Sequence, residues 1–338
     1  MPPVTLSAER PSAGTWDVHL ARWPAADLLQ THGWGEVQGG AGWRVHRLQI
    51  GGQPSLPLLV LQGAGGLPGR PRLYVPRGPA CGPQDLATFA LALDGLRRLA
   101  AALRAVAIEV EVPWEADAVP PDHPWAAWPR VAARQPVATT VVDLSPAPET
   151  ILAGFHAKTR YNVRLAERRG VAVDEDAPLD TLLPCLAATG VRQRIHLPPR
   201  AHFERILTAF GPAAQVLAAR VEGEVVAAVL VVRHGTTATY LYGGSTERHR
   251  ERMPNHLLHW RAMLGARAAG CDRYDLWGLP PTHQVGHPWH GLWQFKVGFG
   301  GPIVTLAGAR VLVLDRRGLQ AARMVESARR LLRRRWRR

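Results

Sequence analysis

Lysine is scarce in this chain, and one lysine lies in a glycine-rich stretch near the C-terminus. The 338 residues include 41 lysines and arginines, of which only Lys158 and Lys296 are lysines. Lys296 stands in WQFKVGFGG, residues 293–301, whose glycines permit a close backbone approach to a ligand or an ordinary bulge. A lysine ammonium suits a small oxyanion, whereas the planar arginine fork suits bidentate partners. Lys296 is therefore a candidate for stabilising negative charge, and the alternative is a lysine that caps a strand or contacts solvent.

Nearby histidines invite a metal-binding interpretation, which their spacing disfavours. His283, His287 and His290 lie in a proline-containing loop, and no cysteine or acid joins them at ligand spacing. The three cysteines of the chain are far apart and form no C-x-x-C pair, which argues against a zinc site and a disulfide framework. The sequence also lacks a G-x-S-x-G elbow, a P-loop and a dinucleotide fingerprint. We therefore expect no metal, no nucleotide cofactor and a reducing cytoplasmic environment.

Positive charge gathers in FHAKTRYNVRLAERRG, residues 155–170, where the periodicity predicts a helix. Its apolar face consists of Ile151, Phe155, Thr159, Val163 and Ala166. Arg160, Arg164 and Arg168 follow one another at i, i+4 spacing, and Lys158 adds a further cation. Like charges at this spacing repel by roughly 0.2–0.5 kcal/mol per pair. A phosphate-rich partner would reverse that sign, so this face is a candidate RNA-binding surface, with a solvated surface helix as the alternative.

The C-terminal segment is the most basic part of the chain. The whole chain has a net charge of +14, and residues 316–338 contain ten arginines and one acid, Glu326, which gives a local charge of +9. The periodicity predicts a helix with one apolar stripe, made of Leu319, Ala322, Val325, Ala328, Leu332 and Trp336. We expect an appendage rather than a core helix. It suits contact with anionic lipid, contact with RNA phosphates, or a solvated extension.

The elements that must position these residues recur in the same order in two halves of the chain. In each half a hairpin and a third strand precede a helix and a further strand: residues 43–62, 72–79, 85–104 and 107–113, then 216–232, 237–245, 254–268 and 273–278. Recurring order without a residue-by-residue repeat indicates two copies of one α/β unit. The predicted domains are residues 1–145 and 146–314, with residues 315–338 as a basic C-terminal helix.

The sequence shows no membrane-spanning pattern. The first residues lack the charged start and apolar run of a signal peptide, and the longest apolar stretch, residues 225–232, has the length of a strand. We therefore expect a protein that works in the cytoplasm or peripherally at the inner face of the plasma membrane.

Several motifs together resemble the Fem family, the aminoacyltransferases that build interpeptide bridges of bacterial peptidoglycan from aminoacyl-tRNA. KTRYNVRLAERRGV resembles the pattern K-x-R-x-N-x-R-x-A-x-x-x-G-V, and HPWHGLWQFKVGFGG resembles G-x-x-x-F-K-x-G-F-G-G. Further segments agree in order: HGWGEVQGGAGWRVHRL, YVPRGP, YLYGGSTERHRERMPNHLLHWRAM and YDLWGLPP. The resemblance spans residues 28–314, and its last motif is long and specific.

The resemblance implies an α/β (α+β) fold with two tandem acetyltransferase-like domains. Some members carry a coiled-coil arm, but no heptad run predicts one here, and we expect a monomer. The resemblance implies that Lys296 lies at the reaction centre, where an amine attacks the ester of a charged tRNA. Trp34 and Phe295 lie in the matched motifs and are expected to contact substrate. Glu111, with Glu109 as an alternative, is the candidate for holding the attacking amine, although neither directly precedes a proline as the family's acid does.

The resemblance also implies acceptor-binding residues, with departures from the family pattern. Arg192 with His196 is the nearest match to an Arg-x-x-x-aromatic pair, although tyrosine is more usual at the second position. Tyr242 matches a strand tyrosine, and Gln38 stands where a lysine near the diphosphate is common. The residues expected to contact tRNA are Lys158, Arg160, Arg164 and Arg168.

The function implied by the resemblance is transfer of an amino acid from aminoacyl-tRNA to the stem peptide of a UDP-linked or lipid-linked muramyl peptide, without a cofactor. Two alternatives stay open. One is an N-acyltransferase of the same fold that uses another activated donor such as acyl-CoA. The other is a non-catalytic protein that binds RNA or a membrane through its basic tail.

Overall fold

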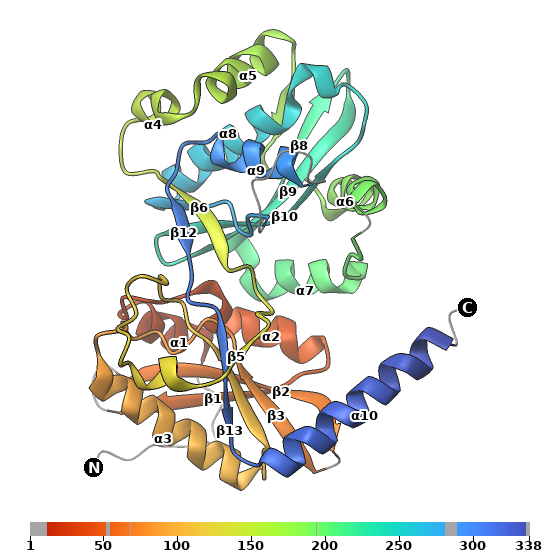
Figure 1. Ribbon diagram of the computed structural model, residues 1–338. Helices are drawn as coiled ribbons and strands as arrows, with labels where there is room; N and C mark the ends of the chain where they lie inside the picture. Colours follow the sequence, from red (N-terminus) through yellow and green to blue (C-terminus); the bar gives the residue numbers. More distant parts are fainter. Residues whose placement is uncertain (1–11, 52–54, 68, 194, 281–288, 336–338) are drawn as a thin grey trace. The chain divides into compact units, whose positions relative to one another are not determined.

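The computed structural model describes residues 12–51, 55–67, 69–193, 195–280 and 289–335, with side chains of 64–67 and 326–335 left aside. The chain forms two compact units (Figure 1). The first consists of residues 1–135 and 306–338, and the second of residues 136–305. Of the residues singled out above, His283, His287 and Trp336 lie outside the described ranges.

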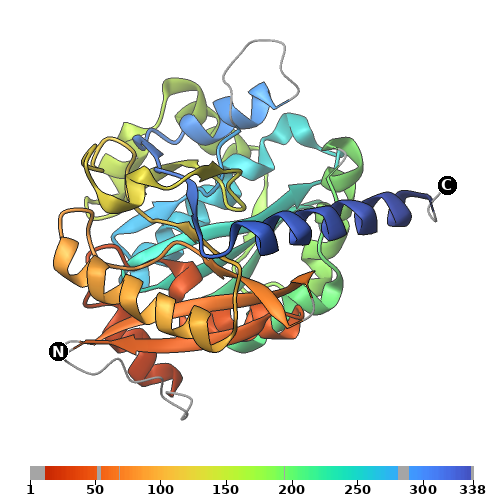
Figure 2. The same cartoon turned by 60° about the horizontal axis from the view of Figure 1, so that its bottom comes forward.

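The first unit is a six-stranded sheet with α3 on one face and α1 and α2 on the other (Figures 1 and 2). Its strands, in spatial order, are β1 (Arg44–Ile50), β2 (Leu56–Leu67), β3 (Arg70–Val75), β4 (Ala107–Glu111), β13 (Ala309–Val313) and β5 (Arg130–Val131). Its helices are α1 (Ala13–Leu20), η1 (Leu28–Gln30), α2 (His32–Gly40), α3 (Leu86–Ala102), η2 (Pro124–Ala127) and α10 (Arg316–Arg335). Helix α3 connects β3 to β4, so these two strands pair in parallel.

A cap and an apolar face explain helix α3. The Asp85 side chain accepts a hydrogen bond from the Thr88 amide at 3.0 Å, which satisfies a donor that has no partner within the helix. Phe89, Leu96 and Leu99 recur at helical spacing and are buried against the sheet. Each such burial stabilises the fold by roughly 1.5–3 kcal/mol.

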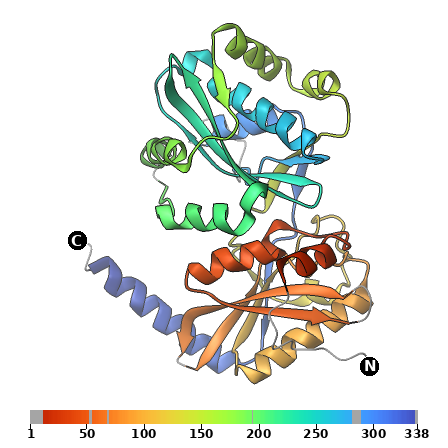
Figure 3. The ribbon, with the colours of Figure 1, turned by 180° about the vertical axis from the view of Figure 1, so that it is seen from behind.

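The second unit is a seven-stranded sheet with α5 and α8 on one face and α6 and α7 on the other (Figures 1 and 3). Its strands, in spatial order, are β12 (Ile303–Thr305), β6 (Ala138–Asp143), β11 (Arg273–Asp275), β10 (Thr237–Ser245), β9 (Glu224–His234), β8 (Ala214–Val221) and β7 (Ala172–Asp174). Its helices are α4 (Pro148–Gly154), α5 (Ala157–Arg168), α6 (Leu179–Gln193), α7 (Arg200–Phe210), η3 (Gly211–Ala213), η4 (Arg250–Arg252), α8 (Pro254–Ala268) and α9 (His290–Val297). Helix α8 connects the parallel strands β10 and β11, as α3 does in the first unit.

The order of elements predicted from periodicity is confirmed in both units, and the fold is mixed α/β. The apolar face predicted for α5 is also confirmed, because Phe155, Thr159 and Val163 are all at most 5% exposed. No coiled-coil arm extends from the helices that the structure describes.

The unit boundaries differ from the predicted ones. Strand β6 pairs with β11 and β12, so the second unit begins at residue 136 and not at 146. Strand β13 pairs with β4 and β5, so the chain returns to the first sheet at residue 306. Local periodicity reveals a strand but not its partner in the sheet, which is why sequence analysis assigned both strands to their neighbours along the chain.

The root of α10 belongs to the core of the first unit, which corrects the expectation of an appendage. Leu319 is 5% exposed and packs with Val106, Ala107 and Val311, and Ala322 is fully buried.

Candidate active site

A cavity of about 1290 Å³ lies in the second unit, where several elements begin or end. Its walls come from the first turns of α5 and α8, the ends of α6 and β10, and helix α9. Pockets for drug-sized ligands usually measure about 300–1,000 Å³, so this cavity has room for a large substrate.

A β-bulge in β10 decides which tyrosine faces the cavity. The pairing of β10 with β9 passes over Leu241, which is therefore an extra residue. In a regular strand residues i and i+2 share a face, but the extra residue puts Tyr240 and Tyr242 on opposite faces. Tyr240 lines the cavity. The Tyr242 hydroxyl instead forms a hydrogen bond with Nε2 of His202 in α7 at 2.9 Å, so the predicted acceptor contact lies outside the cavity wall.

Two glycines at the end of β10 make room on the two faces of the sheet. A Cβ on Gly243 would lie 2.5 Å from the hydroxyl oxygen of Tyr240. A Cβ on Gly244 would collide with the main chain of Cys185 in α6. The position of the Tyr240 ring in the cavity wall therefore depends on the missing side chain of Gly243.

Lys296 is buried in α9 and holds three consecutive main-chain carbonyls. Its side chain is 6% exposed, and Nζ donates hydrogen bonds to the carbonyl oxygens of Leu276 and Gly278 at 2.8 Å each. The contact with the Trp277 carbonyl is longer, at 3.4 Å. Two of the three N–H donors are thus strongly bonded, and the third is only weakly engaged.

The charge of Lys296 lies close to the cavity wall. Nζ is 5.1 Å from the centroid of the Tyr240 ring, and Phe295 and Val297, its neighbours in α9, line the cavity. Burial lowers the pKa of Lys296 from 10.5 to about 8, while the charge of Asp275 acts in the opposite direction. The ammonium form therefore predominates at pH 7.

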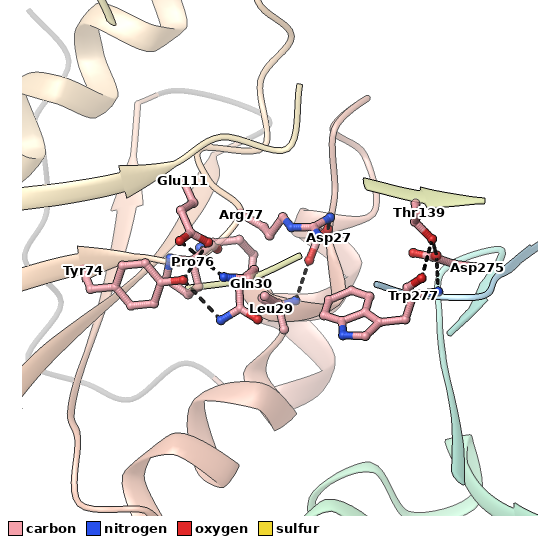
Figure 4. Close-up of polar contacts among 11 residues, drawn as sticks. Asp27, Leu29, Gln30, Tyr74, Pro76, Arg77, Glu111, Thr139, Asp275 and Trp277 are labelled. Atoms are coloured by element: carbon pink, nitrogen blue, oxygen red, sulfur yellow. Dashed lines mark hydrogen bonds and ion pairs between the residues drawn. The ribbon is translucent and has the colours of Figure 1, made fainter. Parts of the chain in front are cut away.

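The turn after β11 explains why these carbonyls converge on Lys296. Asp275 Oδ1 accepts hydrogen bonds from the Trp277 amide at 2.7 Å and from the Thr139 hydroxyl (Figure 4). Trp277 has a φ of 55°, in the left-handed region that few residues other than glycine adopt. An aspartate that bonds the amide two residues further on stabilises such a turn. Asp275 thus stabilises the turn, and the carbonyl groups of that turn hold the Lys296 ammonium in place.

A neutral imidazole forms another part of the cavity wall. His256, in the first turn of α8, accepts a hydrogen bond at Nε2 from Nδ2 of Asn162 in α5 at 3.2 Å. Its ring meets Phe295 edge to face, with centroids 5.1 Å apart. Burial lowers the pKa of His256 to about 4, and the charge of Lys158 adds to this shift. His256 is therefore uncharged at pH 7.

His259 lies one turn further along α8 and connects the cavity wall with the core. Its Nδ1 lies 3.2 Å from the Tyr274 hydroxyl, and its ring meets Tyr240 edge to face at 4.5 Å. Burial lowers the pKa of His259 to about 3, and the charge of Lys296 contributes. The Lys296 ammonium therefore lies beside neutral rings rather than beside other cations.

The predicted RNA-binding cations divide into two kinds. Lys158 is exposed and lines the cavity, and Arg164 and Arg168 are exposed on the outer face of α5. Arg160 instead donates hydrogen bonds at 2.7 and 2.9 Å to two carbonyls at the C-terminal end of α4. Its guanidinium is thus partly engaged in joining α4 to α5.

Arg192 and His196 are not brought together as the predicted pair. Helix α6 ends at Gln193, so the four-residue spacing no longer places both side chains on one helical face. Arg192 lines the cavity and forms an ion pair with Glu247 at 2.6 Å. His196 is exposed and is not part of the cavity wall.

The glycines that follow Lys296 serve packing within the chain. Cβ atoms on Gly298, Gly300 and Gly301 would collide with the Thr159 side chain and with main-chain atoms of α4 and β6. Their close backbone approach is therefore to neighbouring elements.

The remaining predicted residues belong to the first unit. Trp34 is 6% exposed and Gln38 is half-buried, both in α2. Glu111 is 3% exposed and accepts hydrogen bonds from the Tyr74 hydroxyl at 2.9 Å (Figure 4) and from the amides of residues 134 and 135. Burial raises the pKa of Glu111, and these donors oppose the rise.

Several residues of the cavity wall could not be predicted from the sequence, among them Tyr240, His256 and Asn162. Tyr240 was passed over in favour of Tyr242, because the bulge leaves no signal in the alternation of the strand. His256 follows the predicted helix start at Pro254, where an imidazole resembles any solvated residue of a first turn. Asn162 lies in a motif that resembles the Fem family, but the sequence gives it no role. The structure shows that its side chain positions the His256 ring through a hydrogen bond.

A family profile matches the part of the chain that contains Tyr240, His256 and Lys296. The FemAB family profile matches residues 218–325, which include β9 to β11, α8 and Lys296 in α9. This chain carries a FemAB-family region. The resemblance to the Fem family that the motifs predict is thereby confirmed over residues 218–325.

Curated relatives match this chain over a short stretch. The lipid II:glycine glycyltransferase of Staphylococcus haemolyticus is 32% identical over 81 residues, which is 24% of this chain and 19% of the relative. The protein of the same name from Staphylococcus aureus is 33% identical over 79 residues, which is 23% of this chain and 19% of the relative. The match therefore spans about a fifth of the length of these relatives.

Solved structures extend the likeness to the whole fold. The crystal structure of FemX has a TM-score of 0.82 at 20% identity and covers 92% of this chain and 98% of its own. A tandem GNAT protein from the clavulanic acid biosynthesis pathway has a TM-score of 0.52 at 13% identity, with 89% and 94% covered. The predicted fold of two tandem acetyltransferase-like domains is therefore confirmed.

The described residues contain no membrane-spanning helix, metal-binding cluster or disulfide bond. Within the described ranges, no helix combines the length and apolar character needed to cross a bilayer. The same ranges contain no cluster of three histidine, cysteine or acidic side chains suited to a metal ion. Cys81, Cys185 and Cys271 are free and buried.

Proposed function

We propose that this protein transfers an aminoacyl group from aminoacyl-tRNA to an amine on the stem peptide of a peptidoglycan precursor. The observation that carries this proposal is the buried Lys296 ammonium beside a large cavity, within the FemAB-family region. The names of the glycyltransferase relatives support a peptidoglycan precursor as the acceptor.

The proposed aminoacyl transfer requires a positive charge near the ester bond that is broken. The acceptor amine attacks the ester carbonyl carbon and loses a proton, the bond from that carbon to the ribose oxygen breaks, and the ribose leaves as the hydroxyl while an amide forms. Negative charge develops on the carbonyl oxygen during the attack. The weakly engaged N–H of Lys296 is the donor that can turn toward that oxygen, because the other two are fixed by the carbonyls of residues 276 and 278.

The neutral rings around Lys296 favour this use of its charge. Lys296 is buried, and His256 and His259 carry no charge at pH 7, so the field of the ammonium is poorly screened by solvent and is not opposed by a histidine cation. A donor aimed at a developing oxyanion in such a site typically contributes about 3 kcal/mol to the transition state.

The rim of the cavity suits a nucleic acid. Lys158 lines the cavity, and Arg164 and Arg168 continue the positive charge along the exposed face of α5. Phosphates that approach along α5 would relieve the repulsion between these cations. We therefore assign the cavity to the aminoacylated end of the tRNA and the outer face of α5 to its backbone.

The experiment incubates the full chain with a mixture of labelled aminoacyl-tRNAs and a muramyl-pentapeptide precursor, in nucleotide-linked and lipid-linked forms. Mass spectrometry of the precursor should show added mass equal to one or more amino acid residues. A parallel reaction replaces the tRNAs with acyl-CoA donors. Acylation from acyl-CoA, together with no addition from any charged tRNA, would overturn the proposed donor.

A further inference from the structure

Helix α10 changes its character along its length. Its root is anchored, because Leu319 packs against the first sheet, Ala322 is fully buried, and the Asp315 side chain accepts a hydrogen bond from the Gly318 amide at 3.1 Å. The stripe that begins at Ala322 continues in the sequence at i+4 and i+7 with Glu326 and Arg329. Charged residues do not continue an apolar contact, so the sequence pattern predicts that the apolar stripe of the root ends near residue 325.

Figures 2 and 3 show the consequence for the backbone. The later turns of α10 run past the strands of the first sheet instead of lying along them. The second half of the helix is thus an arm with a fixed root within its own unit.

A second apolar stripe begins where the first one ends. Met324 is 68% exposed, and at 100° per residue it lies about 140° around the axis from Leu319. Counted from Met324, the sequence has Ala328, Leu331 and Leu332 at i+4, i+7 and i+8, which is the spacing of one helical face. A second stripe in the sequence thus begins with the exposed Met324, on a different side of the helix from the buried Leu319.

The charge of the segment matches an anionic surface. Residues 316–338 contain ten arginines and one acid, and Arg316, Arg317 and Arg323 are exposed in the structure. A helix with a cationic face and a separate apolar stripe is suited to the interface of an anionic bilayer, where the stripe enters the acyl region and the arginines meet phosphate headgroups.

We propose that residues 324–335 of α10 form a docking surface for an anionic lipid bilayer. Lipid is favoured over RNA because phosphate binding needs the arginines but gives no role to an apolar stripe that begins with the exposed Met324. The anchored root makes the surface part of the first unit, so its binding to lipid would hold that unit at the membrane.

The experiment measures co-sedimentation of the full chain with vesicles of phosphatidylcholine alone and with vesicles that contain one quarter phosphatidylglycerol. We expect binding to the anionic vesicles at least about tenfold tighter than to the neutral ones, and weakened by salt. The variant Leu331→Gln with Leu332→Gln removes apolar character and keeps every charge. The variant Arg330→Glu with Arg334→Glu reverses charge and keeps the stripe. Both should lose most of the binding to anionic vesicles, with thermal melting unchanged.

A control variant and a competing ligand make the outcome decisive. Gln320→Ala changes an exposed residue at the anchored root and should bind vesicles like the unmodified chain. Binding of an uncharged tRNA is measured with the same proteins. The proposal is overturned if the leucine variant binds anionic vesicles as tightly as the unmodified chain, if neutral vesicles bind equally well, or if the charge variant loses only tRNA binding.

Discussion

The two units share an order of elements and differ in what surrounds the acid at the end of one strand. In each unit, the strand that follows the long helix ends in an acid, Glu111 in β4 and Asp275 in β11. Glu111 is enclosed by donors from its own unit. Asp275 instead fixes a turn whose carbonyls hold Lys296 beside a cavity. The same scaffold thus uses a carboxylate for packing in one unit and for the placement of a buried cation in the other.

The largest effect should follow the loss of that cation. Lys296→Met removes the weakly engaged N–H that can turn toward an oxyanion, so we expect the proposed transfer to fall by about 10²–10³-fold. Single-turnover transfer from labelled aminoacyl-tRNA measures this loss. Lys158→Met is the matched control, because it removes the only other lysine from the exposed rim of the same cavity. It should raise the KM for tRNA and spare the single-turnover rate at saturation. Equal losses in both variants would contradict a special role for Lys296.

The enclosed acid of the first unit should matter for stability rather than for transfer. Glu111→Ala leaves three donors without an acceptor, and we expect the free energy of unfolding to fall by about 3 kcal/mol. Denaturant titration measures this change. Glu109→Ala removes a partly exposed ion pair with Arg134 and should cost only about 1 kcal/mol or less. If Glu111→Ala abolished transfer and left the free energy of unfolding unchanged, Glu111 would have a catalytic role, which would contradict this prediction.

The helices and strands of the fold could be predicted from the sequence more completely than the residues of the site. The hydrophobic spacing along α3, α5 and α8 and the strands between them repeats locally, so periodicity was sufficient to predict them. Lys296 was found because its residue type is rare, and Phe295 because it lies in the same motif. The placement of Tyr240 depends on one extra residue in a strand, and the pairing of β13 depends on a partner about 200 positions away along the chain. Neither feature leaves a local pattern to read.

The titration of Lys296 gives a second way to test the contrast between the units. Its pKa is lowered from 10.5 to about 8, so the ammonium is present below pH 8 and is lost above it. We expect the transfer rate, measured with saturating substrates, to be about tenfold lower at pH 9 than at pH 7. Between about pH 8 and 10.5 the unfolded chain binds the extra proton, so this group makes folding more favourable as pH rises through that window. In Lys296→Met both trends should disappear, and a persisting decline in rate would assign it to another group.

A smaller effect should follow from crowding the wall of the cavity. Gly243→Ala places a methyl group 2.5 Å from the Tyr240 hydroxyl, so the ring must move away from its position over Lys296. We expect transfer to fall by about tenfold, because misplacing a wall residue by a fraction of an ångström disturbs substrate alignment. Gly265→Ala in α8 is the control, since its Cβ would meet no atom within 4 Å. It should leave transfer unchanged and stabilise the helix by about 0.5–1 kcal/mol. Equal transfer activity of the two variants would show that the position of Tyr240 does not matter for transfer.

The smallest effect concerns the exposed cations of α5. Arg164→Ala with Arg168→Ala removes two charges that face solvent, so we expect a several-fold higher KM for aminoacyl-tRNA and a salt dependence of log KM that is less steep by about 1.5–2. Stability should not change. Arg160→Ala removes a guanidinium that bonds two carbonyls at the end of α4, so it should lower the free energy of unfolding by about 1–2 kcal/mol and alter the salt dependence less. If the exposed pair left the salt dependence unchanged while Arg160→Ala reduced it, the RNA would follow a different path over this unit.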